Sequence, residues 1–86
     1  MGIGSESRKI LNIVADLAQN NIRNDVLETE IITHSRLSDL EVRNNLNELE
    51  WLHLVKEALP KPVHAEFRLW NITEKGLQEL SYGDAG

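Results

Sequence analysis

The sequence predicts a small α+β domain of three helices, a β-hairpin and a short C-terminal helix. The first observation behind this prediction is a helical pattern at residues 39–52, where Val42, Leu46 and Leu49 share one face through spacings of four and three. The second is a pair of extended runs at residues 54–59 and 66–72, separated by a proline-containing segment. A helix that leads directly into a hairpin therefore organises the second half of the chain.

The third helix, at residues 39–52, carries the strongest local signal. Ser38 can cap it, and Glu41 stands three residues later, which completes the pattern of a capping box. His53 falls four residues after Leu49, so the pattern places it on the same helical face.

Two shorter helices precede it. Ser7 is the predicted cap of a first helix that runs to about Gln19, with a buried stripe at Ile10, Val14 and Leu17. The connector at residues 22–28 has room for a short strand at residues 26–27. We expect Thr29 to cap the second helix, which runs to about Arg36 and turns Ile31 and Ile32 inward.

The hairpin and the last helix complete the predicted domain, which spans residues 7–81 between flexible tails at 1–6 and 82–86. In the run at residues 66–72, strict alternation of apolar side chains fails, which predicts a bulge or a strand end near Trp70. Trp70 itself is most simply a core residue. Thr73 is the expected cap of the last helix, with Leu77 and Leu80 inward.

The composition of the chain limits the classes of function that it can have. The chain has 86 residues, of which 41% are hydrophobic and 27% charged, as in an ordinary soluble domain. It has no cysteine, no apolar run of membrane-spanning length and no signal-peptide pattern, so we expect a cytoplasmic protein without membrane contact. The net charge of −5 disfavours nucleic-acid binding and makes a protein partner a serious competitor.

No residue pattern indicates catalysis, a metal site or a cofactor. The three histidines fall on three different predicted elements and lack metal-ligand spacing. There is no glycine-rich phosphate loop, and Glu28 and Glu30 are expected to be solvated charges. We therefore expect a binding protein and no enzyme.

Three segments resemble the winged-helix (helix-turn-helix) family of transcriptional regulators. They are residues 29–32, residues 37–55 and residues 70–76, and their joint order and spacing resemble most closely small archaeal winged-helix DNA-binding proteins. The resemblance covers about residues 8–80. It implies a winged helix-turn-helix regulator that occupies an operator on double-stranded DNA as a homodimer and carries out no chemistry.

The resemblance also assigns roles to segments. The helix at about residues 39–52 would be the recognition helix, and the hairpin at about residues 56–72 would be the wing. His53 stands where the family usually has glycine, at a helix exit that often needs a positive φ, which histidine tolerates better than most residues.

The resemblance places the candidate DNA contacts on these two elements. On the helix, Asn44 and Asn47 could read adenine and Arg43 could reach guanine or phosphate, and on the wing the candidates are Lys56, Lys61, His64 and Arg68. Acidic neighbours at Asp39, Glu41 and Glu48 oppose this interpretation. A plain solvated face remains an equal alternative, and for Arg43 an ion pair with Asp39 competes with DNA contact.

Leu40 and Trp51 project from the same outward face and could form a partner or dimer surface, since tryptophan is enriched in binding hot spots. The alternative, which we favour, is that Trp51 folds back as peripheral core. The second function that the sequence allows is therefore a winged-helix protein–protein interaction module within a larger assembly.

Overall fold

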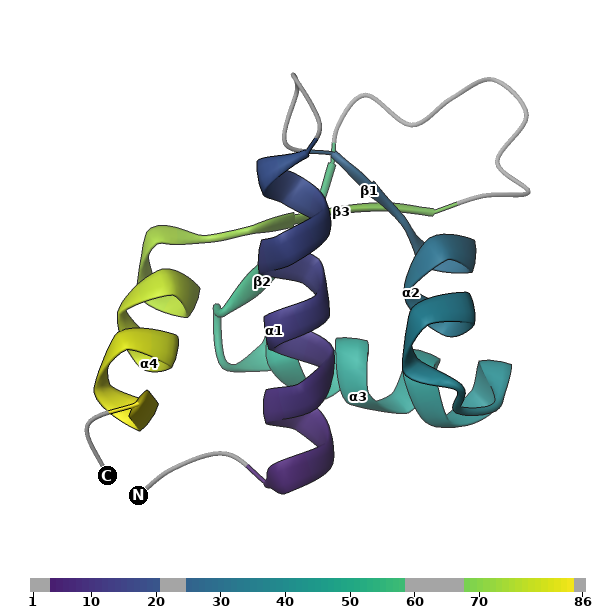
Figure 1. The fold of residues 1–86 in the computed structure, drawn as a ribbon, viewed down its shortest axis with the longest axis horizontal. Coiled ribbons are helices and arrows are strands. Elements are labelled where there is room, and N and C mark those ends of the chain that lie inside the picture. Colours follow the sequence, from purple (N-terminus) through teal and green to yellow (C-terminus); the bar gives the residue numbers. More distant parts are fainter. Residues whose placement is uncertain (1–3, 21–24, 59–67, 85–86) are drawn as a thin grey trace.

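The computed structural model describes residues 4–20, 25–58 and 68–84. Its elements follow the predicted order of helices, hairpin and last helix (Figure 1). They are α1 (Ser5–Gln19), β1 (Val26–Leu27), α2 (Glu28–Ser35), α3 (Asp39–Trp51), β2 (Val55–Glu57), β3 (Leu69–Ile72) and α4 (Glu74–Asp84). Helix α1 stands at the centre between α4 and α2, while α3 runs across one end of it (Figure 1).

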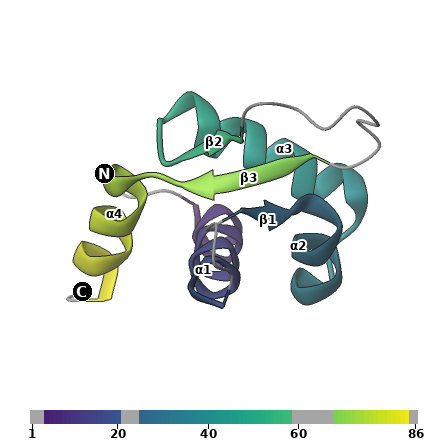
Figure 2. The ribbon, with the colours of Figure 1, turned by 90° about the horizontal axis from the view of Figure 1, so that it is seen from above.

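The three strands form one antiparallel sheet in the order β1-β3-β2, with β3 in the middle (Figure 2). Val26 of β1 pairs with Trp70, and Val55 of β2 pairs with Ile72. The predicted short strand at residues 26–27 is thus confirmed. No bulge lies at Trp70, because it pairs with Val26 on one side and Glu57 on the other. The predicted alternative, a strand end near Trp70, agrees with the start of β3 at Leu69.

One hydrophobic core joins the sheet to the helices. Trp70 is fully buried, as predicted, and is the largest of the fully buried side chains. Ile10, Leu11 and Val14 of α1 belong to the same cluster. The central position of α1 therefore follows from its wide apolar face, which contacts the other helices and the sheet.

Helix α3 begins as the sequence predicts. Ser38 Oγ accepts a hydrogen bond from the Glu41 backbone N–H at 3.2 Å, and Glu41 Oε1 accepts one from the Ser38 N–H at 3.4 Å. Its three stripe residues, Val42, Leu46 and Leu49, are fully buried. The capping box and the buried face are confirmed.

The exit of α3 differs from the prediction in one respect. His53 has a φ of 64°, so the expected left-handed conformation is confirmed. The prediction that His53 continues the helical face of Leu49 is wrong, because the helix ends at Trp51 and the left-handed backbone turns His53 to solvent. Leu54 enters the core in its place.

The starts of α1 and α2 correct two predicted caps. Helix α1 begins at Ser5 after Gly4, so Ser7 lies inside the helix, where its side chain is buried and donates to Asn45 Oδ1 at 2.7 Å. Helix α2 begins at Glu28 directly after β1, which leaves Thr29 inside the helix. Helix α1 therefore begins three residues earlier, and α2 two residues earlier, than caps at Ser7 and Thr29 would place them.

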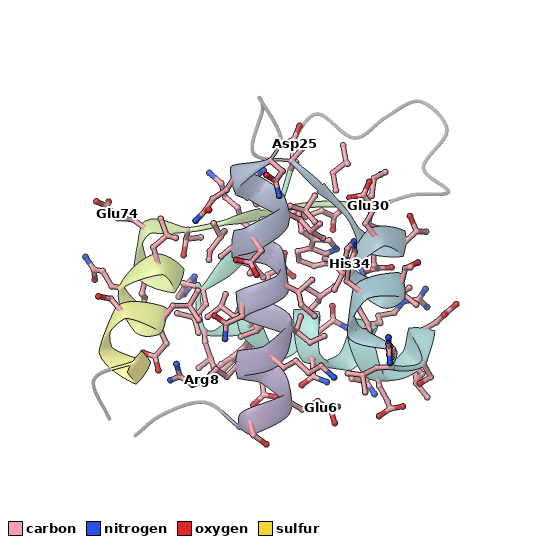
Figure 3. The ribbon with its side chains drawn as sticks, in the orientation of Figure 1. Glu6, Arg8, Asp25, Glu30, His34 and Glu74 are labelled. Atoms are coloured by element: carbon pink, nitrogen blue, oxygen red, sulfur yellow. The ribbon has the colours of Figure 1, made fainter. Side chains whose placement is uncertain are left out.

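Helix α4 is capped by Thr73, as predicted: Thr73 Oγ1 accepts from the Gly76 N–H at 3.0 Å and donates to the His53 carbonyl at 2.6 Å. Leu80 packs against the core as expected, but Leu77 is 50% exposed, because α4 lies at the edge of the fold and covers the core with one face. An ion pair at 3.4 Å joins Arg8 of α1 to Glu79 of α4, and Figure 3 shows Arg8 reaching toward α4.

The ordered elements pass both limits of the predicted domain, since α1 starts at Ser5 and α4 ends at Asp84. The predicted hairpin tip at residues 61–65 lies outside the described residues, and Lys61 and His64 lie with it. Among the residues that the structure describes, no helix is long and apolar enough to cross a membrane.

Candidate nucleic-acid interface

The outward face of α3 is the first part of the candidate interface. Arg43, Asn44 and Asn47 are all exposed, as the helical projection predicts. Leu40 is 66% exposed and Trp51 is 81% exposed on the same helix. The favoured prediction that Trp51 folds back as peripheral core is therefore wrong: the core under this helix is already filled by residues such as Leu46 and Leu49, and the indole points away from it.

Arg43 has an ion-pair partner, but not the predicted one. Its Nη2 atom lies 3.9 Å from Oε2 of Glu28, the first residue of α2, so the pairing runs between helices instead of along α3 to Asp39. The Arg43 side chain is still 54% exposed. It can thus present several N–H groups to solvent while one side of the guanidinium faces a carboxylate.

The described part of the hairpin contributes Lys56 and Arg68, which differ in their surroundings. Lys56 is exposed on β2. Arg68 is drawn inward: Nη2 lies 2.8 Å from Glu57 Oε1, Nη1 lies 3.9 Å from Glu28 Oε1, and the guanidinium stacks on the Trp70 ring at 4.7 Å. Much of the Arg68 charge is therefore offset within the protein.

Glu28 is a residue of this region that the sequence prediction placed in solvent. Its side chain is only 8% exposed, and its Oε1 atom accepts a hydrogen bond from Trp70 Nε1 at 3.2 Å. No local pattern indicates this burial. It arises because Val26 pairs with Trp70 in the sheet, which brings the start of α2 beside an indole 42 positions away in the chain. Glu30 is exposed, as expected.

Asn45 fixes α3 against α1. Its side-chain amide donates to Glu6 Oε1 at 2.8 Å and to the Glu41 carbonyl at 2.7 Å, and its Oδ1 accepts from Ser7. These bonds occupy Asn45 in anchoring the helix. Asn44, its neighbour, is the asparagine that faces solvent together with Asn47.

Acidic residues dilute the positive charge of α3. The exposed carboxylates on this helix are Asp39, Glu41, Glu48 and Glu50.

Beyond the helix end lies an open hollow of about 490 Å³, lined by Glu50, Trp51, Leu52, His53 and Lys75. The described ranges contain no group of three histidine or acidic side chains arranged to hold a metal ion.

This geometry defines a class of fold: a helix-turn-helix pair, α2 and α3, followed by a β-hairpin packed beside the second helix. It is the winged helix-turn-helix. No protein-family profile matches the sequence, and no curated protein is similar to it in sequence.

Several solved structures of bacterial proteins have a similar fold. BpsR of Bordetella bronchiseptica superposes with a TM-score of 0.80 at 12% identity over 96% of this chain. A MepR variant of S. aureus bound to an oligodeoxyribonucleotide gives 0.80 at 16% identity over 96%, and Lactococcus lactis ZitR, a zinc-responsive MarR family member, gives 0.75 at 21% identity over 99%. The chain spans 58%, 56% and 54% of these three proteins, respectively.

Proposed function

We propose that this chain is a DNA-binding transcriptional regulator that acts by occupying an operator, with α3 as the recognition helix and the β2–β3 hairpin as the wing. The observation that carries the proposal is the exposed row of Arg43, Asn44 and Asn47 on the helix that this fold presents to a major groove. Arginine pairs with guanine or phosphate and asparagine with adenine, so the row has the chemistry of base-edge contact.

Two further observations support the proposal. Lys56 is exposed on the hairpin and adds a cation where a wing would meet the phosphate backbone. Proteins of similar fold have been solved with DNA, namely S. aureus MepR and L. lactis ZitR. The regulator would act in the cytoplasm as a homodimer, because two copies place equivalent helices in successive major grooves. The likeness to small archaeal proteins rests on the sequence motifs alone.

A salt titration of binding to mixed-sequence duplex DNA tests the proposal. We expect binding at low salt that weakens steeply between about 50 mM and about 200 mM salt, because each phosphate contact releases counterions. The test plots the logarithm of affinity against the logarithm of salt concentration. Arg43→Ala should make this negative slope shallower by about 1. Lys9→Ala removes the same charge from the exposed face of α1 and should leave the slope nearly unchanged. Absence of binding at micromolar protein and low salt would overturn the proposal.

The exposed apolar residues of α3 favour a second candidate, a winged-helix module that binds a protein partner. Leu40 and Trp51 expose large apolar surfaces on the same helix as four carboxylates, a combination that DNA does not require. The titration separates the two candidates. The second candidate predicts that the chain does not bind DNA and that it sediments as a larger species. It also predicts that Trp51→Ala dissociates this species.

A further inference from the structure

Glu28 occupies a buried position that an apolar residue would fill at a lower cost in free energy. The side chain is buried between α2 and the sheet, against the indole of Trp70. Removing a carboxylate from water costs free energy that its partners must offset, and replacing a buried ion pair by apolar residues is often neutral or stabilising. Stability alone therefore gives a poor reason for a glutamate here.

The contacts of the two carboxylate oxygens divide between two arginines. Oε1 accepts from Trp70 Nε1 at 3.2 Å and lies 3.9 Å from Arg68 Nη1. Oε2 lies 3.9 Å from Arg43 Nη2. Because Arg68 also stacks on Trp70, the indole, the carboxylate and this guanidinium hold one another in place.

These contacts join the two elements of the candidate interface. Arg43 belongs to the recognition helix α3, Arg68 precedes strand β3 of the wing, and Glu28 begins α2. One carboxylate thus faces a guanidinium from the recognition helix and another from the wing. Arg43 is still half exposed, so one side of its guanidinium faces Glu28 while the rest is open to solvent.

We propose that Glu28 is a positioning residue, which orients Arg43 toward a DNA phosphate and holds the wing, through Arg68 and Trp70, at a fixed setting relative to α3. This inference rests on the proposed DNA-binding function and names a group within it that does not itself touch the nucleic acid. Pre-orienting an arginine lowers the entropy lost when it binds a phosphate.

The sign of the effect separates positioning from simple electrostatics. A carboxylate near bound DNA repels phosphate, so electrostatics alone predicts that neutralising Glu28 strengthens binding. Positioning predicts the opposite. Glu28→Gln keeps the shape of the side chain and an oxygen that can accept from Trp70, but it loses the charge that attracts the two arginines.

The experiment measures duplex-DNA affinity for the full chain and for Glu28→Gln at one low salt concentration, with thermal unfolding followed in parallel. We expect Glu28→Gln to bind about threefold to tenfold more weakly, the size of effect found for coupled neighbours. Glu30→Gln is the matched control, since it removes the same charge from an exposed site on α2, and it should bind as tightly as the wild type or more tightly.

Arg43→Lys tests the same link from the exposed side, where a change of side chain does not endanger folding. Lysine keeps the charge but offers a point charge in place of a planar fork, so it should weaken binding if Glu28 orients the group. In the Arg43→Lys background, Glu28→Gln should have a smaller effect than in the wild type.

The outcomes are distinct. A wild-type chain that does not bind DNA overturns the proposed function. A wild-type chain that binds, while Glu28→Gln binds equally or more tightly, overturns the positioning role alone. An Arg43→Lys variant with wild-type affinity overturns it as well, even where Glu28→Gln fails to fold.

Discussion

Gly76 of α4 lies close against the backbone of Leu54, in the segment that follows α3. A Cβ atom built on Gly76 would collide with the carbonyl oxygen of Leu54 and would lie 2.8 Å from Ile72 Cγ1. The first of these atoms belongs to the backbone, which is also tied to Thr73 by a hydrogen bond from the Thr73 N–H to the same carbonyl. The glycine is therefore required for space, because its φ is not in the left-handed region.

We predict that Gly76→Ala lowers the free energy of unfolding by about 2 to 3 kcal/mol, as overpacking against a fixed backbone does. Gly4→Ala is the control, since nothing lies within 4 Å of a Cβ there. It should cost less than about 1 kcal/mol, the range of an alanine at an N-cap. Urea denaturation measures both, and an equal loss in the two variants would contradict the role of space.

Single residues were predictable where a local pattern decides their environment. The spacing of Val42, Leu46 and Leu49 fixed their burial, because a helix repeats every 3.6 residues. The burial of Glu28 was not predictable, since it depends on Trp70, which reaches it only through strand pairing. Trp51 shows the reverse failure: its apolar character suggests burial, yet no described part of the chain covers it.

Among the helices, α3 is the one whose limits the sequence predicts best. Its start is marked by a reciprocal pair of side-chain and backbone hydrogen bonds between Ser38 and Glu41. The starts of α1 and α2 carry no side-chain cap, which explains why Ser7 and Thr29 were poor guides to them. The end of a helix is thus predictable where a capping side chain determines it, and not where tertiary packing does.

The capping box gives a prediction for α3 as an element. Ser38→Ala should lower the free energy of unfolding by about 1 kcal/mol, because it leaves the Glu41 N–H without its acceptor. Ser81→Ala, on the exposed side of α4, should change it by less than about 0.5 kcal/mol. Thermal or urea unfolding checks this, and a Ser38→Ala variant as stable as the wild type would show that packing alone sets the start of α3.

For the molecule as a whole, the sequence predicted the order of elements and the single core, but not the charge distribution of the candidate interface. Net charge is a sum over residues, whereas attraction for DNA depends on which charges are already paired. Arg68 counts as a cation in the sequence, yet it lies against Glu57 and Glu28. Arg43 also faces Glu28 but is half exposed, and Lys56 is exposed, so the cationic character of the described interface rests mainly on these two residues.

The shared core predicts that sheet and helices unfold together. Trp70 lies in the sheet and contacts the helical core, while Trp51 is exposed and can be replaced by Phe with little effect on stability. The chain has only these two tryptophans, so Trp51→Phe leaves Trp70 as the sole indole reporter. In urea, the Trp70 fluorescence and the helical circular dichroism of this variant should change with the same midpoint, as in a two-state transition. Midpoints that differ beyond experimental error would mean that the sheet and the helices are separate cooperative units. In that case α1, although it contacts both, would not couple their unfolding.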